Sequence, residues 1–120
     1  MNITVLWGTL SSDPIARDLP SGDSLISYEV TTPAPDGGRA DTVPVVWFDP
    51  PSRPPALGAG DEVVVSGRVR RRFFRPSGGP TVSRTEVVAD SVLPGRSRAR
   101  VGRLLERRIA ELADASSPAE

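Results

Sequence analysis

The residues best suited to binding chemistry lie between positions 62 and 74, where arginine and phenylalanine begin to replace valine. In an extended strand, alternate side chains point to opposite faces. One outward face would then carry Arg68, Arg70, Arg72 and Phe74. Cationic groups along such a face can contact the phosphates of an oligonucleotide, and a flat ring can stack on its bases. Phe48, at the end of an earlier alternating segment, offers a second ring.

The same residues also allow structural roles. Arg71 falls on the same side of the strand as the valines that we expect to be buried. We therefore expect the strand to project beyond the rim of a β barrel at Arg71, so that both of its faces lie in water. Phe48 and Phe74 would alternatively pack in the core or close one end of it. A segment that returns over residues 81–89 adds one more arginine. The candidate nucleic-acid-binding residues are Phe48, Arg68, Arg70, Arg72, Phe74 and Arg84.

Composition excludes several classes of chemistry. The 120 residues include no cysteine and no histidine, which removes disulfides, thiolate catalysis and the usual zinc sites. We therefore expect no enzymatic activity, no cofactor and no metal. The longest strongly apolar stretch, residues 43–48, is far shorter than the roughly 20 residues of a membrane-spanning helix. No secretory signal opens the chain, so we expect a cytoplasmic protein.

The formal net charge of zero conceals an uneven distribution. Residues 1–66 carry three arginines and nine acidic residues, whereas residues 67–112 carry twelve arginines and four acidic residues. A local basic surface on a neutral protein can bind a polyanion. Arginine supplies every basic position, however, and an arginine-rich composition is also typical of GC-rich genomes. The positions of the arginines are therefore more informative than their number.

Apolar and polar residues alternate in short segments bounded by glycine, proline, aspartate and serine, which predicts strands. We expect five of them, near residues 3–8, 26–31, 42–48, 62–74 and 81–89. Gly67 should mark a bulge or bend in the longest strand, and residues 76–80 should form a hairpin turn. Four prolines make residues 49–55 an irregular surface crossing.

After Gly95 the apolar period changes to about 3.6 residues, which predicts an amphipathic helix. Its apolar stripe comprises Val101, Leu104, Leu105, Ile109 and Leu112. The stripe can pack on the chain's own barrel or on a partner, and both alternatives stay open. We expect a β domain over residues 1–95, a helix over residues 96–113 and a disordered tail over residues 114–120.

Five short strands around one core, with one long bent hairpin, predict an all-β protein. The expected architecture is a five-stranded OB-fold barrel with a C-terminal amphipathic α-helix. OB folds bind oligonucleotides across the face of their middle strands and the flanking loops. The candidate residues lie on such strands.

Short motifs follow one another in order along residues 2–92. They are Asn2-(x5)-Gly8-Thr-Leu10, Asp13-Pro14-(x2)-Arg17-(x2)-Pro20-Ser-Gly22, Val45-Val-(x)-Phe48, Gly60-Asp61-(x)-Val63, Gly67-(x2)-Arg70-(x)-Arg72-(x)-Phe74 and Thr85-Glu-Val-Val88. The ordered set resembles bacterial single-stranded DNA-binding proteins. The resemblance implies an OB barrel that binds single-stranded DNA with little sequence preference, in replication, recombination or repair. It places Phe48 and Phe74 at stacking positions, and Arg70 and Arg72 at basic positions of the same strand face.

The chain departs from the family at Thr42, where a further stacking tryptophan is usual. Fewer rings imply weaker binding or a shorter site. The expected partners are single-stranded DNA at the nucleoid and further copies of the chain, as a dimer or tetramer. Replication and repair proteins are candidate partners, and no membrane is expected. An alternative is an interaction module of the primosomal-protein type, in which the barrel and helix mainly hold other proteins and nucleic-acid contact is secondary.

Overall fold

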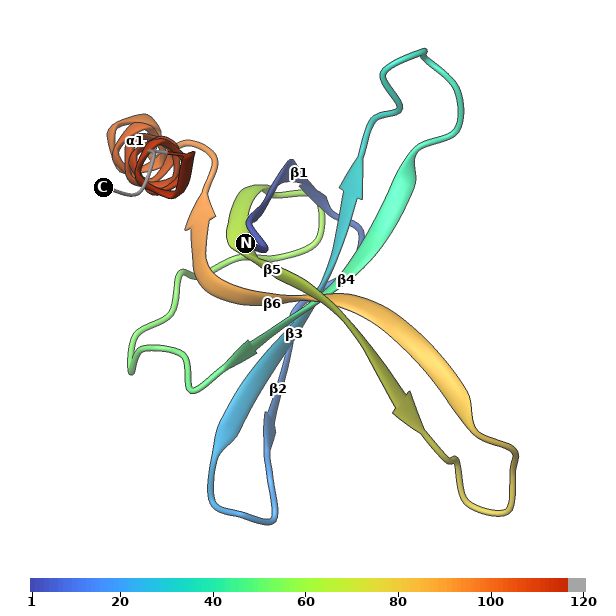
Figure 1. Ribbon diagram of the computed structural model, residues 1–120. Helices are drawn as coiled ribbons and strands as arrows, with labels where there is room; N and C mark the ends of the chain where they lie inside the picture. Colours follow the sequence, from blue (N-terminus) through green and yellow to red (C-terminus); the bar gives the residue numbers. More distant parts are fainter. Residues whose placement is uncertain (117–120) are drawn as a thin grey trace.

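The computed structural model describes residues 1–116, in which strands precede a single helix. The strands are β1 (Thr4–Leu10), β2 (Ile15–Asp18), β3 (Ser24–Thr32), β4 (Asp41–Phe48), β5 (Glu62–Phe74) and β6 (Val82–Pro94), and the helix is α1 (Arg98–Ser116). Figure 1 shows the strands crossing near the centre of the molecule, with α1 on one side.

Strand pairing closes the sheet into a ring. β1 pairs antiparallel with both β5 and β3, β3 pairs with β4, β4 runs parallel to β6, and β6 returns to β5. These five strands correspond to the five expected ones, so the predicted all-β OB fold with a C-terminal helix is confirmed. Ring closure leaves β5 and β6 free to extend as a long hairpin past the barrel (Figure 1).

A sixth strand, β2, was not predicted. It pairs with Ser24–Ser27 of β3, on the same edge of β3 that β1 occupies further along. All four residues of β2 are exposed, so apolar alternation gives no signal there. Turn residues flank the strand on both sides, and pairing with β3 alone makes this segment extended.

The barrel interior holds one cluster of buried apolar side chains. Its members come from alternate positions of the strands: Leu10, Ile26, Tyr28, Val30, Val45, Trp47, Val63, Val65, Val87, Ala89 and Val92. In β1, Leu6 packs against this cluster, whereas Val5 and Trp7 point outward and are 38% and 40% exposed. The inward faces of β3, β4 and β5 follow the alternation of the sequence.

The register of β5 against β6 shifts between Ser66 and Gly67, which confirms the expected irregularity. Asp90 is the extra residue on β6, because Ser66 pairs with Ser91 and Gly67 with Ala89. A Cβ atom at position 67 would overlap the carbonyl oxygen of Val88, so this close approach of two strands requires glycine.

Further along, past the pair Arg70 and Glu86, the β5–β6 hairpin leaves the barrel, and residues 71–74 and 83–85 are exposed on both faces. Arg71 lies in this projecting part and donates a hydrogen bond to Ser83 Oγ at 3.1 Å. The hairpin turn is closed by the Gly79 amide, which donates to the Pro76 carbonyl at 2.9 Å, and Gly78 takes a φ of 73°. The turn predicted over residues 76–80 is therefore confirmed.

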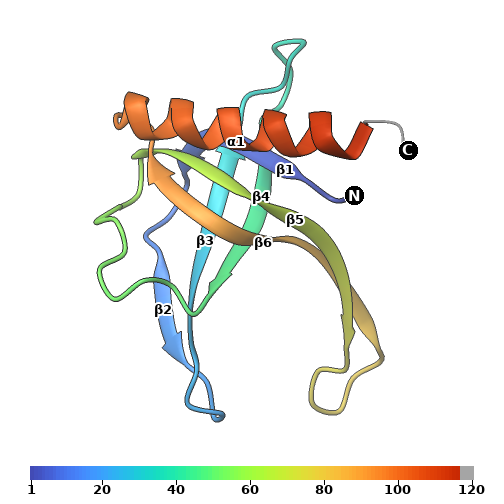
Figure 2. The same cartoon turned by 60° about the vertical axis from the view of Figure 1, so that its left-hand side comes forward.

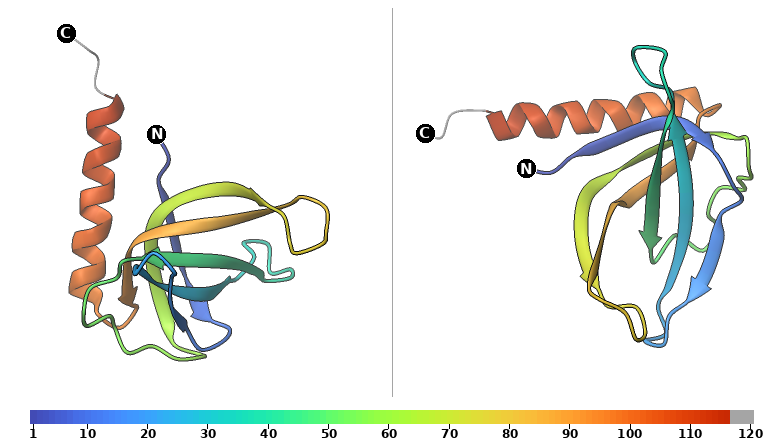
Figure 3. Two further views of the ribbon diagram at one scale, coloured as in Figure 1. Left: turned by 90° about the horizontal axis from the view of Figure 1, so that it is seen from below. Right: turned by 90° about the vertical axis from the view of Figure 1, so that its right-hand side faces the viewer.

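Helix α1 packs on its own barrel through its first half. Val101 and Leu104 are buried against Val64 and Leu93, outside the main core, and Leu105 is partly buried beside them. The second half projects past the sheet (Figures 2 and 3). Two further members of the apolar stripe lie there, Ile109 and Leu112, and they are 65% and 49% exposed.

The helix is offset from its expected range. It begins at Arg98 and includes residues 114–116. The remainder of the expected tail, residues 117–120, lies outside the described residues. No helix in the described part of the chain combines the length and hydropathy needed to span a membrane.

Candidate nucleic-acid interface

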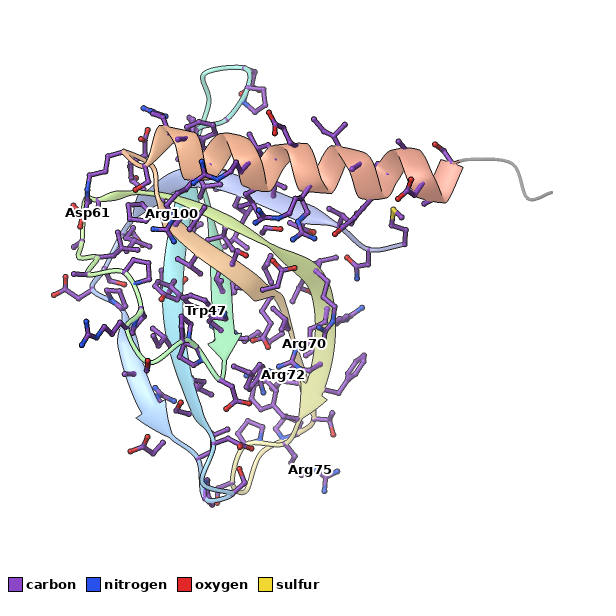
Figure 4. All side chains as sticks on the ribbon, turned by 90° about the vertical axis from the view of Figure 1, so that its left-hand side faces the viewer. Trp47, Asp61, Arg70, Arg72, Arg75 and Arg100 are labelled. Carbon is purple, nitrogen blue, oxygen red and sulfur yellow. The ribbon has the colours of Figure 1, made fainter. Side chains whose placement is uncertain are left out.

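Five of the six candidate side chains gather on the outer surface of β4, β5 and β6. Cross-strand pairing places Arg70 opposite Glu86 and Arg72 opposite Arg84. The end of β4 brings Phe48 next to Arg70. Figure 4 shows Arg70 and Arg72 beside one another on the β5 side of the barrel. We call this surface the arginine–phenylalanine face, and it comprises Phe48, Arg70, Arg72, Phe74 and Arg84.

Two guanidinium groups hold the two rings on the surface. The Arg70 guanidinium lies 5.3 Å from the centre of the Phe48 ring, and the Arg72 guanidinium lies 4.8 Å from the centre of the Phe74 ring. Both phenylalanines are 37% exposed and lie outside the barrel core. Neither ring plugs the barrel, so each combines a cation with an accessible aromatic surface.

One buried carboxylate organises the arginines of this face. Glu86 is 4% exposed, and its Oε2 accepts hydrogen bonds from Arg70 Nε at 2.9 Å and Nη2 at 2.7 Å, and from Arg72 Nε at 3.2 Å. Its Oε1 lies 3.6 Å from Arg84 Nε. Charge-assisted bonds of this kind restrict the guanidinium groups to defined positions. Three arginines around one carboxylate leave the cluster with a formal charge of +2.

A groove of about 400 Å³ adjoins this face. Its far wall comes from β2 and β3 and includes Arg17, Ser27 and Glu29. Figure 2 shows the β2–β3 hairpin and the β5–β6 hairpin extending from the same end of the barrel. In the part of the chain that the structure describes, four arginines and two glutamates line the groove, which gives it a formal charge balance of +2. A positive groove flanked by exposed rings can hold a flexible polyanion that carries flat bases.

Arg17 contributes to the groove although only a motif match singled it out in the sequence. Arg17 lies on β2, whose residues show no apolar alternation. The pairing of β2 with β3 places the Arg17 side chain in the wall of the groove that faces β5. In the sequence, Glu86 appears only within the motif of residues 85–88. Its role as the shared partner of three arginines depends on the β5–β6 register.

Arg68 shares the parity of Arg70 but lies elsewhere. It lines a different hollow, of about 210 Å³, with Asn2, Asp90, Arg108 and Glu111. The cause is the coiling of β5 after the irregularity at Gly67, which turns successive outward side chains from the helix side toward the groove. Parity alone cannot separate Arg68 from its neighbours.

A third aromatic side chain lies on the opposite face of the hairpin. Phe73 is 66% exposed, and the Arg71 guanidinium lies 5.2 Å from the centre of its ring. Sequence alternation assigned this position the parity of the core, so it was not a candidate. The projection of the hairpin beyond the rim, expected from Arg71, was the signal that could have identified it.

No metal site accompanies these groups. Within residues 1–116, no three histidine, cysteine or acidic side chains are placed to hold a metal ion.

Burial raises the pKa of Tyr28, inside the barrel, to about 12. This group belongs to the core and not to the groove.

Comparison with known proteins identifies curated relatives, although no protein-family model matches the chain. A "Single-stranded DNA-binding protein" from Oceanobacillus iheyensis is 36% identical over 99 residues, covering 77% of this chain and 62% of the relative. "Single-stranded DNA-binding protein 2" from Listeria innocua is 35% identical over the same shares. A protein of that name from Staphylococcus aureus strain Mu50 is 34% identical, covering 77% of this chain and 70% of the relative. The chain thus spans somewhat less than two thirds of the length of the first two.

Proposed function

Because the chain belongs to the single-stranded DNA-binding protein family, we propose that it binds single-stranded DNA through the arginine–phenylalanine face. The proposed activity is binding without catalysis. The observation that carries this proposal is the pair of surface rings, Phe48 and Phe74, each flanked by a guanidinium group on one open face.

The energetics of the face suit unpaired nucleotides. Stacking of a base on an exposed aromatic ring contributes about 1–3 kcal/mol, and each base offers a flat surface for it. The arginines of the groove can contact phosphates on the same strand. Duplex DNA keeps its bases stacked on one another, so it cannot use the two rings.

The contacts available on this face favour binding with little sequence preference. Rings and guanidinium groups recognise features that all nucleotides share, namely the flat face of a base and the charge of a phosphate. Glu86 holds Arg70 and Arg72 in defined positions on this face. We propose that the protein acts at the nucleoid, in replication, recombination or repair.

We also propose that the chain works as a homo-oligomer, a dimer or tetramer. Support comes from apolar side chains that the barrel leaves uncovered, namely Ile109 and Leu112 on the second half of α1. The same surface would serve the alternative function, an interaction module for replication or repair proteins.

Titration of a fluorescein-labelled oligo-dT, followed by anisotropy, tests the proposal. We expect tight binding to oligo-dT and much weaker binding to a duplex of equal length. If the four arginines of the groove each neutralise one phosphate, log Kd against log salt should have a slope of about 3, since each phosphate of a single strand contributes about 0.7. Equal affinity for single strand and duplex would contradict the proposal.

A further inference from the structure

A second group of arginines lies on the side of the molecule where α1 begins. We infer that this group forms a second phosphate-binding track, onto which the same DNA strand continues from the groove of the arginine–phenylalanine face. The track consists of Arg96, Arg100, Arg103 and Arg107, here called the helix arginine stripe. The inference rests on the proposed function and extends its site to an element that the motif matches do not cover.

The spacing of Arg100, Arg103 and Arg107 places them on one side of α1, because steps of three and four residues return to the same face of a helix. Arg96 lies in the turn just before α1. Arg100, Arg103 and Arg107 line one hollow of about 200 Å³ against β6. All four side chains are exposed.

The helix arginine stripe lacks acidic partners of its own. Within residues 1–116, none of its four side chains forms an ion pair, whereas Arg98 and Arg108 on the same helix pair with Glu62, Asp90 and Glu111. Like charges three or four residues apart destabilise a helix. A bound polyanion would remove this repulsion, so the arrangement suits an anionic ligand better than it suits the free helix.

A chain of hollows joins the helix arginine stripe to the groove. The groove shares Arg17 with a hollow between the β2–β3 hairpin and Pro50–Pro54. That hollow shares Pro51 with a larger one, of about 390 Å³, where β6 ends. The larger hollow includes Arg53 and Arg96, and it shares Arg100 with the hollow of the helix.

An arginine therefore lies at each stage of this route. Among the described residues, two acidic side chains line these hollows as well: Asp18, the last residue of β2, and Asp90, the extra residue within β6. Asp90 lies 3.8 Å from Arg108, which partly compensates its charge. Figure 4 shows Arg100 under the start of α1, with Trp47, Arg70 and Arg72 following toward the hairpin.

The chemistry of the track selects phosphates and not bases. Among residues 1–116, Trp47 is the one aromatic residue that lines these hollows, and it is only 8% exposed and belongs to the barrel core. A negatively charged peptide would offer a similar ligand. Continuity with the groove favours a strand whose negative charge repeats along its length, because such a strand can occupy both surfaces at once.

The test compares the wild-type protein with the triple variant R100Q/R103Q/R107Q. Both are titrated with oligo-dT of about 6 and about 16 nucleotides, near the limits that single OB folds cover. Each lost phosphate contact should cost about 5-fold at ~0.1 M salt, from a slope of about 0.7 per phosphate. For the longer strand we therefore expect up to about 100-fold weaker binding and a salt slope smaller by about 2. Affinity for the shorter strand should stay within about 2-fold, since the stacking rings hold it in the groove.

Two measurements control for unrelated effects. Circular dichroism and thermal unfolding should show an intact helix, because glutamine is a good helix former. The single variants R103Q and R39Q remove the same charge, but Arg39 lies in the loop between β3 and β4, away from these hollows. Only R103Q should weaken binding of the longer strand.

The outcomes separate this inference from the proposed function. Unchanged affinity of the triple variant for both strands would refute the track and would direct attention to an acidic protein partner. Equal losses for both strands would also refute it, because they would indicate a general electrostatic effect. If the wild-type protein binds neither strand, the proposed function itself fails.

Discussion

Replacement of Phe74 by alanine tests the central role of the exposed rings. Phe74 is the last residue of β5, it is 37% exposed and it does not belong to the core cluster. The variant loses one stacking surface, which contributes about 1–3 kcal/mol per base. Since 1.4 kcal/mol corresponds to a tenfold change, Kd for oligo-dT should rise about 5-fold to 150-fold.

The neighbouring residue supplies a matched control. Phe73 is also aromatic and also lies under an arginine, at 5.2 Å compared with 4.8 Å for Phe74, but it points to the opposite face of the hairpin. Phe73→Ala should change Kd by less than about 2-fold. Both variants should remain folded, because a cation–π contact at an exposed site contributes only about 0.5–1 kcal/mol.

Anisotropy of a labelled oligonucleotide is the appropriate assay. Intrinsic tryptophan fluorescence is less informative, since Trp47 is buried and Trp7 lies against Arg98 of the helix, at 5.2 Å. The salt dependence provides a second criterion. The ring carries no charge, so the Phe74 variant should shift log Kd equally at every salt concentration and leave the slope unchanged.

Two results would refute the reasoning. If the Phe74 and Phe73 variants lose affinity equally, DNA does not select the face that carries the arginines of the groove. If neither variant loses affinity while the protein still binds oligo-dT, base stacking on the hairpin does not contribute.

Three further predictions concern stability. Burial raises the pKa of Tyr28 from 10.0 to about 12, so as the pH rises Tyr28 loses its proton in the unfolded chain before it does so in the folded protein. The free energy of unfolding should therefore fall by roughly 2–3 kcal/mol between pH 10 and 12. Tyr28→Phe, measured by denaturant unfolding, should abolish this loss. Gly67→Ala should destabilise the protein by about 1–3 kcal/mol, because the added Cβ overlaps the Val88 carbonyl. Gly102 lies on the helix with open space around it, so Gly102→Ala should stabilise the protein by about 0.5–1 kcal/mol. Thermal unfolding of the two variants should show these opposite changes in stability. Glu86→Gln should lower stability by about 1–2 kcal/mol, a modest value because the three arginines around this carboxylate are one third or more exposed, and unchanged thermal stability would show that the cluster is not structural.

Much of the fold could be predicted because alternation and turn residues are local signals. The inward faces of β3, β4 and β5 follow from apolar residues at every second position. Gly67 indicated the irregularity in the longest strand, and the turn over residues 76–80 indicated its hairpin. β2 could not be predicted in this way, since its residues are all exposed and only pairing with β3 makes it extended.

The candidate site was predictable to the extent that the odd or even position of a residue in a strand determines the side to which its side chain points. Phe48, Arg70, Arg72, Phe74 and Arg84 come together as expected from alternation. Parity assumes a flat strand, and β5 coils. For this reason Arg68 lies beside the helix. Phe73 has the parity of the core residues but is exposed, because the hairpin projects beyond the rim of the barrel there.

The sequence alone determined the main strands, the helix and the outward face of the long hairpin, because each depends on a local period of apolar residues. Only the tertiary structure decided which charges meet. The proximity of Arg17 to β5, the position of Glu86 among three arginines and the route from the groove to α1 all join residues far apart in the chain. Such contacts depend on strand register, coiling and ring closure, and these arise from the packing of the whole barrel.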